Sequence, residues 1–228
     1  MHALSGGAFC ITLEPVLALW DFHDSASPKP TDEQLAEALQ LVDDDRLVLS
    51  GDRMVTLPAG MTIDLGGIAK GYIADKIAGL VQYRVSGAVL NFGGNVYVVG
   101  LKPNGSLFNV GIRDPQGDAE ESLLVFSCSD TAVVTSGIYE RYVEYDGVRY
   151  HHILDPETGS SAMIDLASAT IVSESSLTAD AIATVCMVLG SEKALAFLQE
   201  NGYDGLLITR DNQVLTTENY PYQIRMMK

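Results

Sequence analysis

Apolar residues recur along this chain at two spacings, every three to four residues in some segments and every second residue in others. The first spacing is typical of a helix that packs on a core. Thr31, followed three residues later by Gln34, is a capping-box signal, and Gly202 is a typical helix end. The pattern predicts helices over residues 32–42, 67 to about 83, 179–189 and 192–200.

The period-two segments are short and are separated by turn residues. Asp146-Gly147, between alternating apolar residues, predicts a type I′ hairpin, and Asp211-Asn212 predicts another hairpin. Strands are expected over residues 47–49, 54–57, 88–99 (interrupted at 93–95), 107–113, 123–128, 132–134, 139–145, 148–154, 166–172, 206–209 and 213–215. Because hairpins dominate and βαβ spacing is scarce, we predict an α+β fold with a largely antiparallel sheet and packed helices.

Composition and charge narrow the class of protein. The 228 residues are 47% hydrophobic, enough for one sizeable core. The net charge of −16 argues against a broad basic surface, so we expect no nucleic-acid partner. No apolar run approaches the ~18 residues that span a membrane. The first residues, MHALSGG, lack the features of a signal peptide, so neither a signal nor an anchor is expected here.

The cysteines give no recognisable framework. Cys10, Cys128 and Cys186 are odd in number and form no CxxC pair. This spacing argues against a zinc site and against a set of disulfides. Cys128 and Cys186 lie in apolar surroundings and are expected to be small core residues.

The segment DLGGIAKG, residues 64–71, lies between a strand-like approach and a helical pattern. A helix start offers free N–H groups and a positive dipole end to a phosphate. Gly66 and Gly67 would allow a ligand to approach the backbone, and Lys70 supplies a mobile positive charge. A plain Gly-Gly turn with Asp64 and Lys70 on the surface is an equally good interpretation. The segment is neither a P-loop nor a G-x-G-x-x-G motif.

A second polar segment, YHHILDPETG at residues 150–159, ends a predicted strand in a proline turn. We expect His151 to be a half-buried side chain that is satisfied by a neighbour. For His152 the residues leave two interpretations open. It is either of that same kind, or a functional histidine that serves as general base, metal ligand or hydrogen-bond donor.

A third segment, LTADAIAT at residues 177–184, contains Asp180 and Thr184 four residues apart, on one helix face. Thr178 is expected to be the N-cap, which would place Asp180 in the first turn. A carboxylate above a hydroxyl suits Mg²⁺ or Ca²⁺. Alternatively, Asp180 only complements the helix dipole and Thr184 only packs.

Together and in order, these segments resemble a known family. DLGGIAKGYIAD, LNFGGNVYVVG, VTSGIYER, HHILDPETG and TADAIATVCMVLG, preceded by SGGAFCITLEPVLALW at residues 5–20, are similar to the ApbE family of FAD:protein FMN transferases. The resemblance covers essentially the whole chain. It implies an ApbE-like (T-fold-like) α+β architecture and a Mg²⁺-dependent enzyme. Such an enzyme transfers the FMN moiety of FAD to a Thr or Ser hydroxyl of a target flavoprotein and releases AMP.

The resemblance also implies roles for residues around the nucleotide phosphates. Asp180 and Thr184 match the family's Mg²⁺ ligands, and Gly67 matches a position whose backbone carbonyl completes that metal site. Asp64 and Lys70 match contacts to the flavin nucleotide. Lys70 is therefore expected to hold phosphate oxygens during the reaction.

Further roles implied by the resemblance fall on the other segments. Ala8, Phe9 and Leu154 match the isoalloxazine or adenine environment, and His152 matches the histidine next to the reacting phosphate. We interpret His152 as the general base, as a hypothesis. At position 10, in the same nucleotide-binding stretch, the family usually has Asp, whereas this chain has Cys10, whose thiol cannot supply a carboxylate's pair of acceptors.

The resemblance implies a single domain over residues 1–228 that is N-terminally truncated relative to the family. We therefore expect that self-association or a partner chain could complete the flavin pocket. By resemblance, the site of action is extracytoplasmic and membrane-associated, at the periplasm or the cell surface. Three other functions stay open: a Mg²⁺-dependent FAD pyrophosphatase, a non-catalytic FAD-binding protein, and an α+β interaction domain without a ligand.

Overall fold

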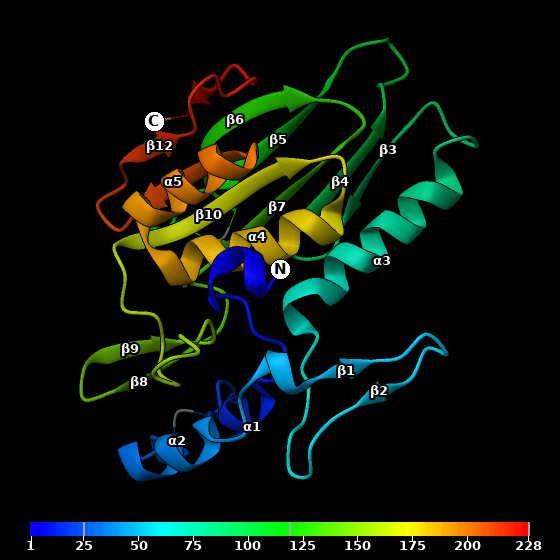
Figure 1. Cartoon of the computed structure of the whole chain (residues 1–228). Coiled ribbons are helices and arrows are strands. Elements are labelled where there is room, and N and C mark those ends of the chain that lie inside the picture. Colours follow the sequence, from blue (N-terminus) through cyan, green and yellow to red (C-terminus); the bar gives the residue numbers. More distant parts are fainter. Residues whose placement is uncertain (25, 119, 228) are drawn as a thin grey trace. The chain divides into compact units, whose positions relative to one another are not determined.

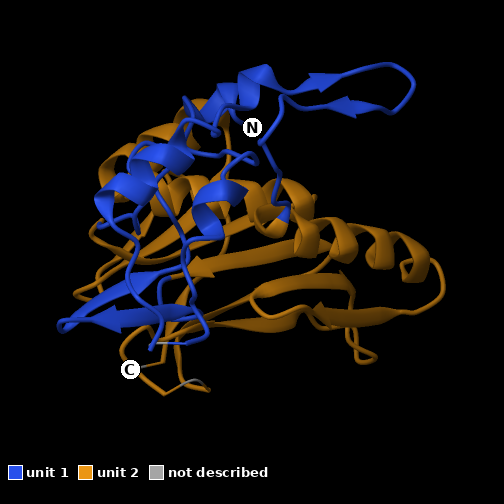
Figure 2. Cartoon of the chain, turned by 90° about the horizontal axis from the view of Figure 1, so that it is seen from below, with its two compact units in different colours: residues 1–65, 138–163 blue, residues 66–137, 164–228 orange. Residues whose placement is uncertain are grey.

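The computed structural model describes residues 1–24, 26–118 and 120–227. Its contacts divide the chain into two compact units, coloured separately in Figure 2. Unit 1 comprises Met1–Leu65 and Ile138–Met163, and unit 2 comprises Gly66–Gly137 and Ile164–Lys228. Each unit is described by itself. The single-domain interpretation of the sequence stays a prediction.

Unit 2 is built on a six-stranded sheet in which all neighbouring strands are antiparallel. The strand order is β12-β11-β10-β7-β4-β3. Strand β10 is buried at all but its last position, as expected of a central strand covered on both faces. The strands are β3 (Gly87–Asn91), β4 (Asn95–Gly100), β7 (Thr131–Gly137), β10 (Leu166–Ser173), β11 (Asp204–Thr209) and β12 (Val214–Thr216).

Helices cover one face of this sheet, as Figure 1 shows for α4 and α5. A second, three-stranded sheet of order β13-β6-β5 shares an apolar core with the first sheet. Phe126 and Leu124 are among its largest fully buried side chains. The remaining elements of unit 2 are α3 (Gly66–Val81), α4 (Ser176–Leu189), α5 (Ser191–Asn201), β5 (Phe108–Arg113), β6 (Ser122–Cys128) and β13 (Arg225–Met226).

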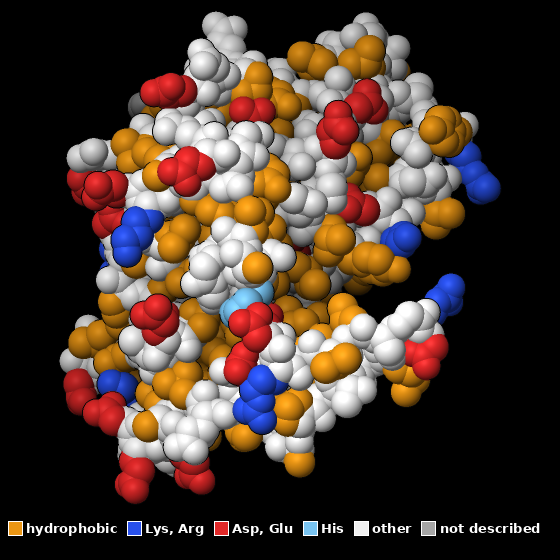
Figure 3. All heavy atoms as spheres, in the orientation of Figure 1, with side chains coloured by type: hydrophobic (Ala, Val, Ile, Leu, Met, Phe, Trp, Pro, Cys, Tyr) orange, Lys and Arg blue, Asp and Glu red, His pale blue; other side chains and the backbone are white. Residues whose placement is uncertain are grey.

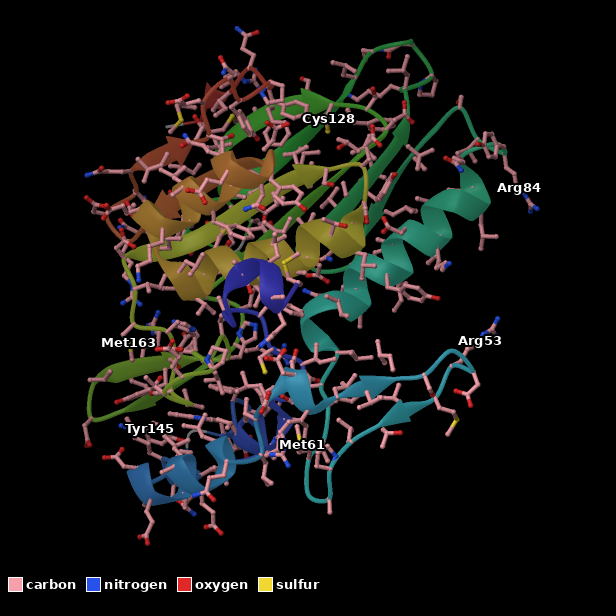
Figure 4. All side chains as sticks on the ribbon, in the orientation of Figure 1. Arg53, Met61, Arg84, Cys128, Tyr145 and Met163 are labelled. Atoms are coloured by element: carbon pink, nitrogen blue, oxygen red, sulfur yellow. The ribbon has the colours of Figure 1, made fainter. Side chains whose placement is uncertain are left out.

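Unit 1 is smaller and combines short helices with two hairpins. Trp20 and Val16 lie at its core, and the Trp20 Nε1–H donates to the Gly159 carbonyl (3.0 Å). Arg53 marks the tip of the β1–β2 hairpin (Figure 4). The elements are η1 (Ala3–Ser5), α1 (Glu14–Leu17), α2 (Asp32–Leu39), η2 (Asp44–Arg46), β1 (Val48–Leu49), β2 (Val55–Thr56), β8 (Tyr142–Tyr145) and β9 (Val148–His151).

The predicted fold class, α+β with a largely antiparallel sheet, is confirmed. Two local signals are also confirmed. Thr31 and Gln34 form the expected capping box at the start of α2. Asp146 and Gly147 both have positive φ, 52° and 75°, and join β8 to β9 as a type I′ turn requires.

Two expectations were wrong in detail. The segment 88–99 is not one interrupted strand but two, β3 and β4, which pair antiparallel around Gly93-Gly94. Both glycines have positive φ, so the chain reverses there instead of continuing. Helix α4 begins at Ser176, and its N-cap is Ser175, whose Oγ accepts from the Thr178 N–H, so Thr178 is not the cap.

The charge of the visible surface and the character of the helices agree with what the composition predicted. Asp and Glu outnumber Lys and Arg on the face shown in Figure 3, in keeping with the net charge of −16. Within the described part of the chain, no helix combines the length and apolar character that a membrane span needs.

Candidate functional site

The start of α4 packs directly on α3 at Gly71. A Cβ at this position would overlap the Ser176 carbonyl oxygen and would lie 2.7 Å from the Leu177 Cα. Only glycine therefore allows the two backbones to approach this closely. The close approach explains why the glycine at the end of DLGGIAKG lies inside a helix, where glycine is otherwise unfavourable.

One turn further along α3, Asp75 caps the start of α4. Its carboxylate accepts from the Ser176 N–H (2.7 Å), the Leu177 N–H (3.1 Å) and the Ser175 Oγ–H (2.9 Å). These backbone groups have no partner inside α4. Asp75 thus fixes the position of α4 on α3, a role that the sequence analysis missed. The only signal for it was the last letter of the motif DLGGIAKGYIAD.

Asp180 is the buried carboxylate at this contact, with an exposed fraction of 3%. Its Oδ2 accepts from the Gly71 N–H (2.9 Å). In a regular helix that N–H would donate to the carbonyl of Gly67, four residues earlier. The contact therefore brings the Asp180 carboxylate to the second turn of α3.

The charge state of Asp180 reflects opposing effects. Burial raises its pKa above the ordinary value, while the Gly71 N–H, the Lys70 charge and the Asn95 side chain favour the ionised form. Thr184 lies on the same helix face, because its Oγ1–H donates to the Asp180 carbonyl (3.2 Å). Asp180 sits in the second turn of α4, since the helix begins at Ser176, so the dipole interpretation of Asp180 loses its basis.

Asn95, the first residue of β4, is fully buried beside Asp180. Among the residues that the structure describes, neither its amide nitrogen nor its amide oxygen has a partner at hydrogen-bond distance and angle, although the amide lies near enough to Asp180 to favour the ionised carboxylate. Orphaned buried amides are rare in native proteins and indicate a missing ion or water. The sequence analysis did not select Asn95, because its significance depends on burial and on a neighbour 85 positions away.

These groups fit a magnesium ion. A carboxylate, an amide oxygen, a hydroxyl and a backbone carbonyl are the hard oxygen donors that Mg²⁺ prefers. Asp180, Asn95, Thr184 and Gly67 supply one of each. The Asn95 amide is the main evidence for a cation here, because a cation with its water shell would give that amide the partner it lacks.

Lys70 lies next to this group on α3. Its Nζ is exposed and donates to the Gly93 carbonyl (3.4 Å) in the β3–β4 turn. The interaction joins the segments DLGGIAKG and LNFGGNVYVVG within unit 2. Gly94 is held there by a hydrogen bond from the Thr135 N–H to its carbonyl (2.9 Å). Lys70 therefore places a positive charge at the β3–β4 turn, close enough to Asp180 to favour its ionised form.

Several predicted nucleotide contacts lie in unit 1. Phe9 is buried, and its N–H donates to Ser5 Oγ (3.1 Å), whereas Ala8 is half-buried. The Asp64 N–H donates to the Ile11 carbonyl (2.8 Å), which brings Asp64 beside the segment that contains Ala8 and Phe9. Leu154 is buried in the apolar core of unit 1, and its place in the flavin environment stays a prediction.

The two adjacent histidines differ as expected. His151 is buried, its Nε2 lies 3.0 Å from the Ala162 carbonyl oxygen, and its own carbonyl accepts from the Ser161 Oγ–H. His151 is therefore fully buried and not half-buried as predicted, while its Nε2 has the neighbouring partner that was expected. His152 is half-buried, and its Nδ1 lies 3.2 Å from the Arg141 carbonyl oxygen. A carbonyl there requires hydrogen on Nδ1, which leaves the lone pair on Nε2.

The site residues thus form two groups. Lys70, Asp180 and Thr184 come together in unit 2, Gly67 lies on the same helix as Lys70, and the structure adds Asp75 and Asn95. The residues predicted for flavin binding and for the base lie in unit 1, and these are Ala8, Phe9, Cys10, Asp64, His152 and Leu154.

Comparison with known proteins identifies the family. The ApbE family model matches residues 1–207. The chain is 41% identical to the FAD:protein FMN transferase of Treponema pallidum, over 98% of this chain and 66% of that protein. It is 35% identical to the FAD:protein FMN transferase of Klebsiella pneumoniae, over 96% of this chain and 68% of that protein. It therefore spans about two thirds of the length of these relatives.

Solved structures agree with the sequence comparison. The crystal structure of the ApbE protein from Thermotoga maritima matches with a TM-score of 0.88 and 33% identity, over 96% of this chain and 72% of that chain. The flavinyl transferase ApbE of Pseudomonas stutzeri matches with a TM-score of 0.81 and 33% identity, over 95% of this chain and 69% of that chain. The resemblance seen in the sequence motifs is confirmed: the chain belongs to the ApbE family.

Proposed function

We propose that this chain transfers the FMN moiety of FAD to a Thr or Ser hydroxyl of a target flavoprotein, with release of AMP and with Mg²⁺ as the metal. The relatives from Treponema pallidum and Klebsiella pneumoniae are FAD:protein FMN transferases, which supports the reaction class. The observation that carries the proposal is the buried group of Asp180 and the unpaired Asn95 amide beside the glycine-rich start of α3.

The start of α3 and Lys70 would bind the pyrophosphate of FAD. The first N–H groups of a helix have no internal partner, and the helix dipole favours an anion there. Gly66 and Gly67 carry no Cβ, so phosphate oxygens can approach the backbone at this end of α3. Lys70 follows these glycines on α3 and is exposed. Its ammonium group would hold a phosphate oxygen and offset the negative charge on that oxygen as the bond to the leaving group breaks.

Asp180, Thr184, Asn95 and the Gly67 carbonyl would hold Mg²⁺. When bound, Mg²⁺ supplies charge neutralisation of the pyrophosphate and of the departing AMP. The carboxylate of Asp180 is fixed for this purpose by the Gly71 N–H, and Asp75 fixes the helix that carries it.

His152 would act as general base. The acceptor hydroxyl oxygen forms a bond to the phosphorus of the FMN half, the anhydride P–O bond breaks, and AMP takes the bonding electrons. The hydroxyl proton goes to Nε2 of His152, which carries the lone pair because Nδ1 faces the Arg141 carbonyl. Ala8, Phe9, Asp64 and Leu154 would contact the flavin nucleotide, as the family resemblance implies.

The acceptor protein and the site of action rest on the family resemblance alone. We propose a flavoprotein acceptor and an extracytoplasmic, membrane-associated location. We also propose that self-association or a partner chain completes the flavin pocket. Light scattering with and without the acceptor would test the last point, because a monomer that binds FAD fully by itself would contradict it.

Incubation of the chain with FAD and Mg²⁺, with or without EDTA and an acceptor domain, tests the reaction. AMP release together with covalent FMN on the acceptor, both abolished by EDTA, supports the proposal. AMP and free FMN without attachment would show a pyrophosphatase instead, and neither product would overturn both. Asp180→Asn should lose the reaction, whereas the matched control Glu200→Gln, on an exposed position of α5, should keep it.

A further inference from the structure

A second group of metal-ligating side chains lies in unit 1, outside the site described above. It consists of His2, Cys10 and Asp44 and is called the His2–Cys10–Asp44 cluster below. One potential ligand atom from each residue lies within 4.8 Å of the other two. The Cys10 Sγ–H donates to Asp44 Oδ1 (3.0 Å), and His2 Nδ1 lies 3.7 Å from Asp44 Oδ2.

Local structure holds the three residues in place. Gly6 and Gly7 both have positive φ, 60° and 92°, and turn the chain so that His2 and Cys10 come together. The Gly7 N–H donates to the His2 carbonyl (3.0 Å), and His2 Nδ1 lies 3.0 Å from the Phe9 carbonyl oxygen. The cluster is therefore built from a short turn and is not an accident of long side chains.

Asp44 is fixed from the other side. The N–H groups of Ile11 and Thr12 donate to its carboxylate at 2.9–3.1 Å, and Thr12 Oγ1–H donates at 2.8 Å. Most of these bonds reach Oδ1, so Oδ2, which faces His2, keeps the greater capacity for a further partner. Because the carboxylate is already oriented, little conformational entropy remains to be lost when it takes a ligand.

We propose that His2, Cys10 and Asp44 bind a zinc ion, with the fourth coordination position open to water. A thiolate, an imidazole and a carboxylate are all zinc ligands, and three protein ligands plus an open position form a recognised type of zinc site. Thiolate and imidazole are poor ligands for Mg²⁺, which separates this site from the oxygen group around Asp180.

The distances suit such an ion after a small adjustment, in which Cys10 Sγ and Asp44 Oδ1 move slightly apart. With zinc bonds of about 2.0–2.3 Å, the ligand atoms of a tetrahedral site lie roughly 3.3–3.8 Å apart. The His2 Nδ1–Asp44 Oδ2 separation of 3.7 Å falls within this range, and the Cys10 Sγ–Asp44 Oδ1 separation of 3.0 Å lies just below it. The side chains are 28% exposed for His2 and 11% for Asp44, so an ion can enter from solvent on the His2 side.

Binding releases one proton in this scheme. The Cys10 thiol loses its proton to solvent and forms the zinc–sulfur bond. His2 stays neutral, its hydrogen moves from Nδ1 to Nε2, and the Nδ1 lone pair forms the zinc–nitrogen bond in place of the contact with the Phe9 carbonyl. Burial and the neighbouring Asp44 raise the pKa of Cys10 to about 11, so zinc must compete with the thiol proton throughout the neutral range.

The absence of a CxxC pair argued against a zinc site in the sequence analysis, because that criterion covers only sites built from paired cysteines. Here the ligands are of three kinds and come from residues 34 positions apart, which spacing rules do not cover. The cluster also adjoins Ala8 and Phe9, so a bound ion would stiffen a segment that we assign to flavin binding. The zinc proposal itself does not depend on the proposed transferase reaction.

Isothermal titration of the full chain with Zn²⁺, in millimolar Mg²⁺, tests the proposal. We expect one zinc per chain, with affinity that falls at least about 100-fold in Cys10→Ser and in His2→Ala. The matched controls His23→Ala and Asp45→Asn change exposed residues of the same unit and should keep the affinity. Asp180→Asn should also keep it, which excludes zinc at the magnesium group.

Two further readouts separate the site from weak surface binding. Co²⁺ in place of zinc should give a sulfur-to-cobalt charge-transfer band that Cys10→Ser removes. The apparent affinity for zinc should rise about 10-fold per pH unit, because one proton is released. Absence of zinc binding by the wild-type chain, or equal binding by a folded Cys10→Ser variant, would overturn the proposal, and circular dichroism establishes that each variant is folded.

Discussion

Replacing Asn95 by Leu should have opposite effects on stability without and with Mg²⁺. Asn95 is fully buried, and its amide atoms find no partner among the described residues. A buried polar group without a hydrogen bond costs about 1–3 kcal/mol, and Leu has a similar size without that cost. In EDTA, therefore, Asn95→Leu should raise the free energy of unfolding by about 1–3 kcal/mol.

With Mg²⁺ the order should reverse. A ligand that binds only the folded state adds RT ln(1 + [L]/Kd), about 2.7 kcal/mol at a concentration 100 times Kd. The wild-type chain should gain this increment, and Asn95→Leu should lose most of it because the amide oxygen no longer serves the ion. The change also removes a group that favours the charged form of Asp180, which weakens the site further.

Urea unfolding followed by circular dichroism measures both effects in the same variant. The control Asn109→Leu changes an exposed amide on β5 and should keep the Mg²⁺ increment. If Asn95→Leu loses more than about 1 kcal/mol in EDTA, the amide is satisfied in the metal-free protein and the reasoning fails. An unchanged Mg²⁺ increment in the variant would remove Asn95 from the metal site.

Four other changes test neighbouring parts of the account. Gly71→Ala should destabilise the chain by at least about 1–3 kcal/mol in urea unfolding, because its Cβ would overlap the start of α4; unchanged stability would contradict the close approach. Asp75→Asn should cost about 0.5–2 kcal/mol through the lost cap of α4, visible as a lower melting temperature. His152→Ala should slow FMN transfer ~10²–10⁴-fold while FAD affinity stays within about 2-fold, and a normal rate would exclude the base role. Burial raises the pKa of Asp180 in the folded protein, so the protonated carboxyl stabilises the fold at low pH, and this stabilisation is lost as the pH rises through the folded pKa. In EDTA, the free energy of unfolding should therefore fall over that pH range in the wild type and not in Asp180→Asn.

Local signals in the sequence predicted local structure well. Asp146-Gly147 requires a tight turn with positive φ, and the capping box of Thr31 fixes a helix start, so both could be identified from a few residues. The i, i+4 spacing of Asp180 and Thr184 likewise placed them on one face. The start of α4 was misplaced because Ser175 and Thr178 are both good caps, and the choice between them depends on Asp75, a hundred positions away.

The rest of the site depends on contacts that no local pattern contains. Asn95 becomes significant only because β4 buries it beside Asp180, and Gly71 only because α4 lies against it. Cys10 was judged by its spacing from other cysteines, whereas its neighbours are a histidine from the same turn and Asp44 from η2. Such groups are brought together by the antiparallel fold, so they can be identified only from the three-dimensional structure.

The central claim is that a divalent cation held by Asp180 and its neighbours is required to move FMN onto an acceptor. Intact-mass measurement of an acceptor domain after incubation with FAD and this chain tests it most directly. The account predicts that the acceptor gains the mass of one FMN with the wild-type chain and Mg²⁺, and gains none in EDTA or with Asp180→Asn. Equal labelling of the acceptor under all of these conditions would contradict it.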